Sequence, residues 1–176
     1  LCAASAQYAQ PKYGFDKDAA LVERHFSGRT TVERALTSER LMDLLTTEHY
    51  DIIHMVVRVN PENGELCFPD LHDEVGSDTD VVSPRALRAL LEESRTRLVV
   101  LATCNALLTA VEVAPVANMA ASFTEIVDDI AVGWADRFYR LLVQGKSVWK
   151  AFDLANEQRE TTIRTIRQKD VRFKLR

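Results

Sequence analysis

Cysteine and histidine are the residue types in this sequence that could supply a nucleophile and its base. Cys104 ends the apolar run Arg97-Leu-Val-Val-Leu-Ala-Thr-Cys104 and is followed by Asn105. A cysteine thiolate attacks a carbonyl carbon, and a nearby histidine then protonates the leaving group. Cys104 is therefore the candidate nucleophile. His54, which lies 50 residues upstream, is one candidate base.

Two apolar runs are expected to position these side chains. An apolar, β-branched run entered from a charged residue is typical of a buried strand in a parallel sheet. The segment 97–104 has this pattern, and so has Asp51-Ile-Ile-His-Met-Val-Val-Arg58. If the two strands are neighbours and start level, Arg58 comes beside Cys104. His54 then lies near Val100, about 13 Å short of the strand end at roughly 3.3 Å per residue.

Capping residues and apolar periodicity predict the other elements. Ser83-Pro84 is a helix start, Ser122 to Glu125 forms a capping box, and Gly145 suits the residue after a helix end. The turn sequence Asn60 to Gly64 predicts a hairpin. Helical segments are expected over 17–25, 32–47, 84–94, 105–112, 122–144 and from Ser147 onward. Thr30 or Thr31 is expected to cap the second of them, and the buried residues of the helix over 122–144 are expected to be Ile126, Ile130, Trp134, Phe138 and Leu142. Strands are expected over 1–9, 51–58, 65–68, 97–104 and 113–119.

This alternation of strands and helices predicts an α/β fold. A mostly parallel central sheet with helices on both faces is the usual result. In such sheets ligands and chemistry gather beyond the carboxyl ends of the strands, where Cys104 is expected. A chain of 176 residues is expected to form one domain. Residues 157–176, which are rich in Arg and Lys, are expected to be a basic helix or linker.

Composition excludes several classes of function. The net charge of −4 gives no reason to expect nucleic acid or an anionic membrane as partner, and no apolar run approaches the ~20 residues of a membrane span. The three cysteines have no metal-binding spacing. We therefore expect a cytoplasmic domain without metal or cofactor. The chain starts without methionine inside an apolar run, which indicates a domain of a longer protein.

Several sequence blocks occur in the order found in one family. They are Tyr50 to His54, Glu62 to Phe68, Ser83 to Leu91, Leu98 to Asn105 and Phe138 to Phe152. Together with the caspase-like spacing of His54 and Cys104, these blocks resemble the CHAT family of the caspase and separase clan, over residues 30–156. The resemblance implies a caspase-like α/β fold and, in many members, a Cys-His dyad that cleaves peptide bonds. It also implies a protein or peptide partner, neighbouring repeat or sensor domains, and a place in prokaryotic defence or cell-death signalling.

The sequence departs from that family at the base. CHAT proteins have a strand resembling His-Phe-Ala-Gly-His-Gly, whose second histidine is catalytic, whereas this chain has His54-Met-Val-Val-Arg58-Val59. Arg58 therefore occupies the dyad-histidine position. Valines replace both flanking glycines, and valine disfavours the close backbone approach that glycine permits. The residues after Cys104 also lack the glycine of many members.

This departure favours a domain that does not cleave. A guanidinium stays protonated and cannot shuttle a proton, and losing acid–base help typically costs ~10²–10⁴ in rate. We expect an interaction or regulatory module, in which Cys104 is a small buried apolar residue at a strand end. The alternative is an active cysteine endopeptidase that uses a histidine from elsewhere. His54 is expected to be a hydrogen-bonded core residue and only a weak alternative base, and His72 to be exposed in an acidic loop.

Overall fold

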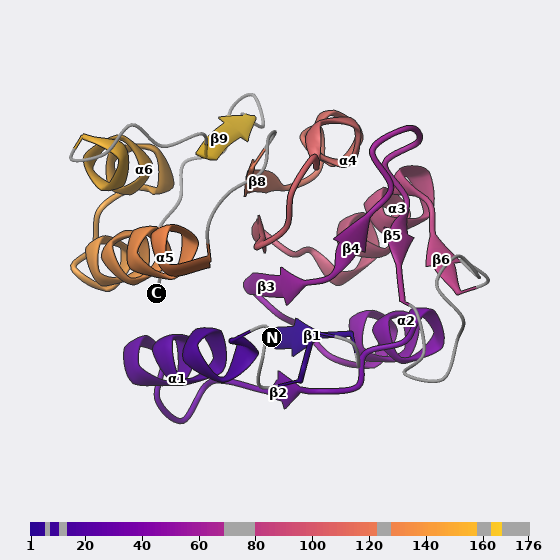
Figure 1. Ribbon diagram of the computed structural model, residues 1–176, viewed down its shortest axis with the longest axis horizontal. Helices are drawn as coiled ribbons and strands as arrows, with labels where there is room; N and C mark the ends of the chain where they lie inside the picture. The colour runs from indigo at the N-terminus through magenta and orange to yellow at the C-terminus, as the bar shows by residue number, and fades with distance from the viewer. Residues whose placement is uncertain (6–7, 11–13, 69–79, 123–127, 158–162, 167–176) are drawn as a thin grey trace.

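The computed structural model describes residues 1–5, 8–10, 14–68, 80–122, 128–157 and 163–166. Its main sheet has the order β2-β1-β3-β7-β8-β9 (Figure 1). The first five strands are parallel, and β9 runs antiparallel to β8. This arrangement confirms the predicted α/β class and is consistent with a caspase-like layout. The strands are β1 (Cys2–Ala4), β2 (Val32–Glu33), β3 (Ile52–Val56), β7 (Leu98–Leu101), β8 (Asn118–Ser122) and β9 (Ile163–Ile166).

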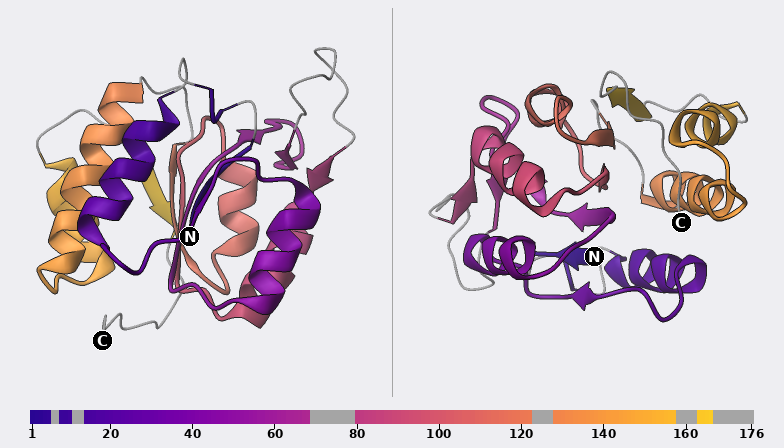
Figure 2. Two further views of the ribbon diagram at one scale, coloured as in Figure 1. Left: turned by 90° about the horizontal axis from the view of Figure 1, so that it is seen from below. Right: turned by 180° about the vertical axis from the view of Figure 1, so that it is seen from behind.

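Two helix layers cover the sheet, one on each face (Figure 2). One layer contains α1 (Phe15–His25), α5 (Asp128–Val143) and α6 (Val148–Asn156), and the other contains α2 (Ser38–Thr47), α3 (Pro84–Ser94) and α4 (Leu107–Val113). Alternate residues of β3 and β7 enter opposite apolar clusters: Met55 and Leu101 pack with the α2–α4 layer, and Val56 and Val100 with the α1–α5–α6 layer. Both faces are therefore buried, which explains why the strands are almost wholly apolar.

A second, three-stranded antiparallel sheet follows β3. It contains β4 (Arg58–Val59), β5 (Leu66–Cys67) and β6 (Val81–Val82). The predicted hairpin is confirmed, with the Asn60 amide donating to the Glu65 carbonyl at 2.9 Å. The single strand predicted over 51–58 was wrong in its extent, because β3 ends at Val56 and Arg58 opens β4.

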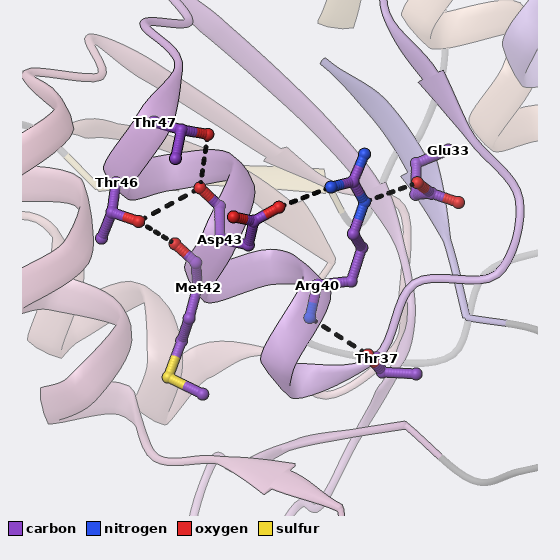
Figure 3. Close-up of polar contacts among 7 residues, drawn as sticks. All are labelled: Glu33, Thr37, Arg40, Met42, Asp43, Thr46 and Thr47. Atoms are coloured by element: carbon purple, nitrogen blue, oxygen red, sulfur yellow. Dashed lines mark hydrogen bonds and ion pairs between the residues drawn. The ribbon is translucent and has the colours of Figure 1, made fainter.

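The helix predicted over 32–47 starts later than its apolar pattern indicated. Residues 32–33 form β2, and α2 begins at Ser38. The cap is Thr37, not Thr30 or Thr31: its backbone is extended and its Oγ1 accepts a hydrogen bond from the Arg40 amide at 3.1 Å (Figure 3). The Arg40 side chain also contacts Glu33 at 3.1 Å and Asp43 at 2.5 Å. These contacts tie the start of α2 to strand β2.

The predicted end of α5 and the predicted start of α6 are confirmed. Gly145 has φ +81, and its amide donates to the Leu142 carbonyl at 2.9 Å. Ser147 caps α6, with its hydroxyl accepting from the Lys150 amide at 3.3 Å. In α5, Trp134, Phe138 and Leu142 are buried as predicted, but Ile130 is 36% exposed, because the helix meets the core only further along. The helix predicted over 122–144 starts too early, because Ser122 is the last residue of β8 and α5 begins at Asp128. The rest of the predicted capping box and Ile126 fall on 123–127, which lie outside the described residues, as does His72.

Other predicted boundaries also need correction. The strand predicted over 1–9 contains only Cys2–Ala4, and the one predicted over 113–119 begins at Asn118, because α4 continues to Val113. The segment 163–166, predicted as part of a basic helix or linker, forms β9 beside β8. No helix within the described ranges is both long enough and apolar enough to cross a lipid bilayer.

Candidate functional site

The candidate site lies where β3 and β7 end at the same edge of the sheet. The two strands are parallel neighbours, and Met55 opposite Leu101 is their last pair. His54 lies opposite Val100, which confirms the predicted register. Arg58 is three residues past Met55, and Cys104 is three residues past Leu101. The two segments therefore leave the β3–β7 ladder at the same level. A direct contact between Arg58 and Cys104 stays a prediction.

Arg58 is held by the second sheet. It is half-buried and lies opposite Cys67 in the β4–β5 ladder. Its neighbours Val57 and Val59 are 1% and 6% exposed and pack in the α2–α4 cluster. Both valines are thus core residues, and they fix the backbone on both sides of Arg58.

Cys104 lies in a bend between β7 and α4. It is partly exposed and not buried as predicted, whereas Cys2 and Cys67 are buried. The next residue, Asn105, has φ 59. This left-handed conformation strongly favours glycine, and asparagine is among the few other residues that adopt it readily. Asn105 therefore makes a turn that glycine would also make readily.

His54 is a core residue, as predicted. It is 1% exposed, and its Nδ1 lies 2.7 Å from the Tyr139 hydroxyl. Burial, reinforced by Cys2 and Asp18, raises the pKa of Tyr139 well above its ordinary value. Tyr139 therefore stays protonated, and its hydroxyl is the hydrogen-bond partner of Nδ1.

Asp18 approaches the other side of the His54 ring. Its Oδ1 lies 3.2 Å from Nε2, within ion-pair distance but not aligned for a hydrogen bond. The contact is therefore electrostatic, and water screens it little because Asp18 is only 7% exposed. The sequence analysis missed both Asp18 and Tyr139 as partners of His54. The spacing of Asp18 was a usable signal, since it falls on the buried stripe of α1 between Phe15 and Val22.

A small cavity extends from His54 toward the Cys104 segment. Its volume of about 20 Å³ is enough for about one water molecule. Asp18 and His54 line it on one side and Ala102 and Thr103 on another, and further apolar lining comes mainly from alanines and Trp134. The cavity is too small for a ligand of drug or peptide size.

His25 and His49 lie at the opposite edge of the sheet. Both border a cavity of about 1060 Å³ that is also lined by residues preceding β1, β3 and β7 (Leu1, Asp51 and Arg97). His25 Nε2 lies 2.7 Å from Asp136, and His49 Nδ1 lies 2.7 Å from the Ser94 carbonyl. Neither imidazole can serve as a base for Cys104 in this arrangement. Among the described residues, no three His, Cys, Asp or Glu side chains gather as metal ligands would.

No protein-family model matches this chain, and no curated protein does so at a significant level. What the site can do chemically therefore follows from its geometry. It contains one partly exposed thiol, a fixed arginine on the adjoining chain segment, and an imidazole buried among other partners.

Proposed function

We propose that this chain is a caspase-like, CHAT-type domain whose Cys104 site does not cleave peptide bonds, and that it acts as an interaction or regulatory module for a protein or peptide partner. One observation supports the proposal: Arg58 follows the last β3–β7 pair by three residues, as Cys104 does, so the strand that adjoins the Cys104 segment continues into an arginine rather than a histidine. A guanidinium can stabilise negative charge, but it cannot accept and return a proton. Hydrolysis of a peptide needs that exchange to release the amine.

The positions of the described imidazoles support this proposal. His25 and His49 border the cavity at the far edge. His54 is buried against Tyr139 and Asp18. A partly exposed thiol without a nearby proton carrier leaves the carboxyl edge of the sheet free for binding rather than cleavage, and this edge is where α/β proteins commonly bind ligands. Neighbouring repeat or sensor domains, and a role in prokaryotic defence or cell death, belong to the proposal through the family resemblance.

The alternative is an active cysteine endopeptidase with Cys104 as nucleophile. The cavity between His54 and Thr103 favours it, because a rearrangement along that cavity would bring the imidazole toward the thiol. The alternative requires His54 to leave Tyr139.

Native alkylation and peptide cleavage together test the proposal. Iodoacetamide at neutral pH, followed by peptide mapping, reports the reactivity of Cys104, while buried Cys2 and Cys67 serve as internal standards. We expect Cys104 to react no faster than a free cysteine, and we expect a peptide library to survive incubation with the wild-type domain. Cleavage that disappears in Cys104→Ala would overturn the proposal. A Cys104 as inert as Cys2 would exclude the endopeptidase.

A further inference from the structure

The tip of the β4–β5 hairpin packs closely against α4 (Figure 1). The Thr109 hydroxyl, which is fully buried, donates a hydrogen bond to the Gly64 carbonyl at 2.6 Å. Gly64 has φ +75, and a Cβ there would lie 2.8 Å from the Leu108 Cβ and 3.0 Å from the Thr109 amide nitrogen. Only glycine allows the turn and the helix to come this close. Hairpin and helix are thus joined at nearly backbone-to-backbone distance.

This contact joins the two chain segments that form the candidate site. Past Met55 and Leu101 the segments separate: one enters the second sheet at Arg58, and the other turns at Asn105 into α4. Gly64 follows Arg58 by six residues, and Thr109 follows Cys104 by five. The Gly64–Thr109 contact brings the segments together again on the far side of both residues.

We infer that Thr109 and Gly64 are positioning residues that hold the Cys104 segment in a fixed relation to Arg58. The inference rests on the proposed function, in which Arg58 and Cys104 belong to one site. Without the contact, the hairpin and α4 can shift independently. The Arg58 guanidinium then no longer affects the reactivity of the Cys104 thiol.

A double-variant cycle tests the inference through the rate of Cys104 alkylation by iodoacetamide. Arg58→Gln is measured in the wild type, in Thr109→Val, which removes the hydroxyl but keeps the shape, and in Thr109→Ser, which keeps the hydroxyl. We expect Arg58→Gln to change the rate at least about twofold, the lower limit of a measurable coupling. The change should persist in Thr109→Ser and vanish in Thr109→Val. If Thr109 only stabilised the fold, the alkylation rate of Cys104 would still depend on Arg58 in Thr109→Val.

Gly64→Ala provides an independent disruption, and Gly28→Ala is its matched control. Gly28 has a similar φ of +72, but a Cβ there meets no atom within 4 Å. We expect Gly64→Ala to abolish the effect of Arg58→Gln and Gly28→Ala to preserve it, with a cooperative thermal transition showing that each variant is folded.

The outcomes separate the two proposals. If Arg58→Gln changes nothing in the wild type, Arg58 and Cys104 do not form one site, and the proposed function loses its main support. If Arg58→Gln acts in the wild type and equally in folded Thr109→Val or Gly64→Ala, the positioning inference fails while the site stands. Loss of the effect in Gly28→Ala would also overturn the inference, because strain alone would then suffice.

Discussion

At the scale of single residues, Asn105 connects the candidate nucleophile to the helix that follows it. Its φ of 59 turns the chain directly after Cys104 and leaves Asn105 itself exposed. A β-branched residue in this conformation forces its Cβ toward the following carbonyl, whereas the short side chain of asparagine tolerates it. The turn that follows Cys104 therefore depends on the backbone preference of Asn105.

We expect Asn105→Val to lower the free energy of unfolding by about 1–2 kcal/mol, the cost of a left-handed conformation. Asn105→Gly should stay within about 1 kcal/mol of the wild type, because glycine adopts this conformation freely. Urea denaturation of both variants measures the difference. An Asn105→Val domain as stable as Asn105→Gly would mean that the turn is not strained.

Arg58→His is expected to restore no cleavage, although it recreates the family's dyad in sequence. Buried Val57 and Val59, and the pairing of residue 58 with Cys67, keep the backbone in the β4 ladder. The new imidazole is then held by a strand whose flanking valines leave the backbone no freedom to bring it to the thiol. The assay is hydrolysis of a peptide library, with Arg58→His/Cys104→Ala as control. Cleavage by the single variant that the control lacks contradicts the prediction.

The sequence was sufficient to predict the buried place of His54, because it follows from position along an apolar run. The strand predicted over 97–104 was too long: β7 ends at Leu101, and Cys104 lies in the bend that follows. The partners of His54 were not predictable in the same way. Tyr139 lies 85 residues further along the chain than His54, and its approach depends on which helices cover that face of the sheet. Such a pairing is a property of the assembled layers.

At the scale of elements, Thr37 determines where α2 begins. Its hydroxyl accepts the Arg40 amide, one of the donors that have no partner inside the helix. Thr37→Ala should lower the free energy of unfolding by about 0.5–2 kcal/mol. Thr31→Ala, at an exposed position before β2, is the matched control and should change little. Thermal and urea unfolding measure both, and equal losses would show that the helix start is misplaced.

Asp136 connects α5 to α1. It accepts a hydrogen bond from the His25 ring and also contacts Arg24. The hydrogen bond from His25 lowers the pKa of Asp136 below its usual range, burial opposes this shift, and the charges of Arg24 and Arg140 add to it. Because the folded pKa lies below the unfolded one, this stabilisation is complete above the unfolded pKa and is lost as pH falls through the folded pKa.

Asp136→Asn should therefore destabilise the domain at pH 7 by about 1 kcal/mol or less, since the pair is partly exposed. The difference from the wild type should shrink as the pH falls through the acidic range. Urea unfolding of both proteins at several pH values from neutral to acid provides the measurement. A difference that grows toward acid pH would contradict the assigned sign.

At the scale of the whole molecule, the two sheets share one core. Val59 and Leu66 of the small sheet pack in the same apolar cluster as Leu87 and Leu91 of α3 and Met55 of the main sheet. The small sheet has only two residues in each strand and cannot be stable by itself. It should therefore unfold together with the main sheet.

The buried cysteines test this expectation, because Cys2 lies in the main sheet and Cys67 in the small one. Burial, with a smaller contribution from Asp18, raises the pKa of Cys2 to about 12, so its native thiol is unreactive at neutral pH. As urea increases, both cysteines should become alkylated with one common midpoint. Two separate midpoints would show that the small sheet opens independently.

The alternation of strands and helices, and the burial of both sheet faces, could be predicted because apolar period and capping residues indicate them locally. The division of 51–58 between two sheets could not, since Val57 continues the apolar run through the bend. Strand β9 was missed for a related reason. Its segment is only four residues long, and its backbone pairs with β8, which lies more than 40 residues earlier in the chain.

Strand β2 ends the main sheet with only two residues, Val32 and Glu33. A border this short offers another chain few free amides and carbonyls, so it is a poor template for growth of the sheet into fibres or swapped dimers. Arg40 also donates a hydrogen bond to the Glu33 carboxylate on this edge strand. On this flank the protein is thus protected against self-association.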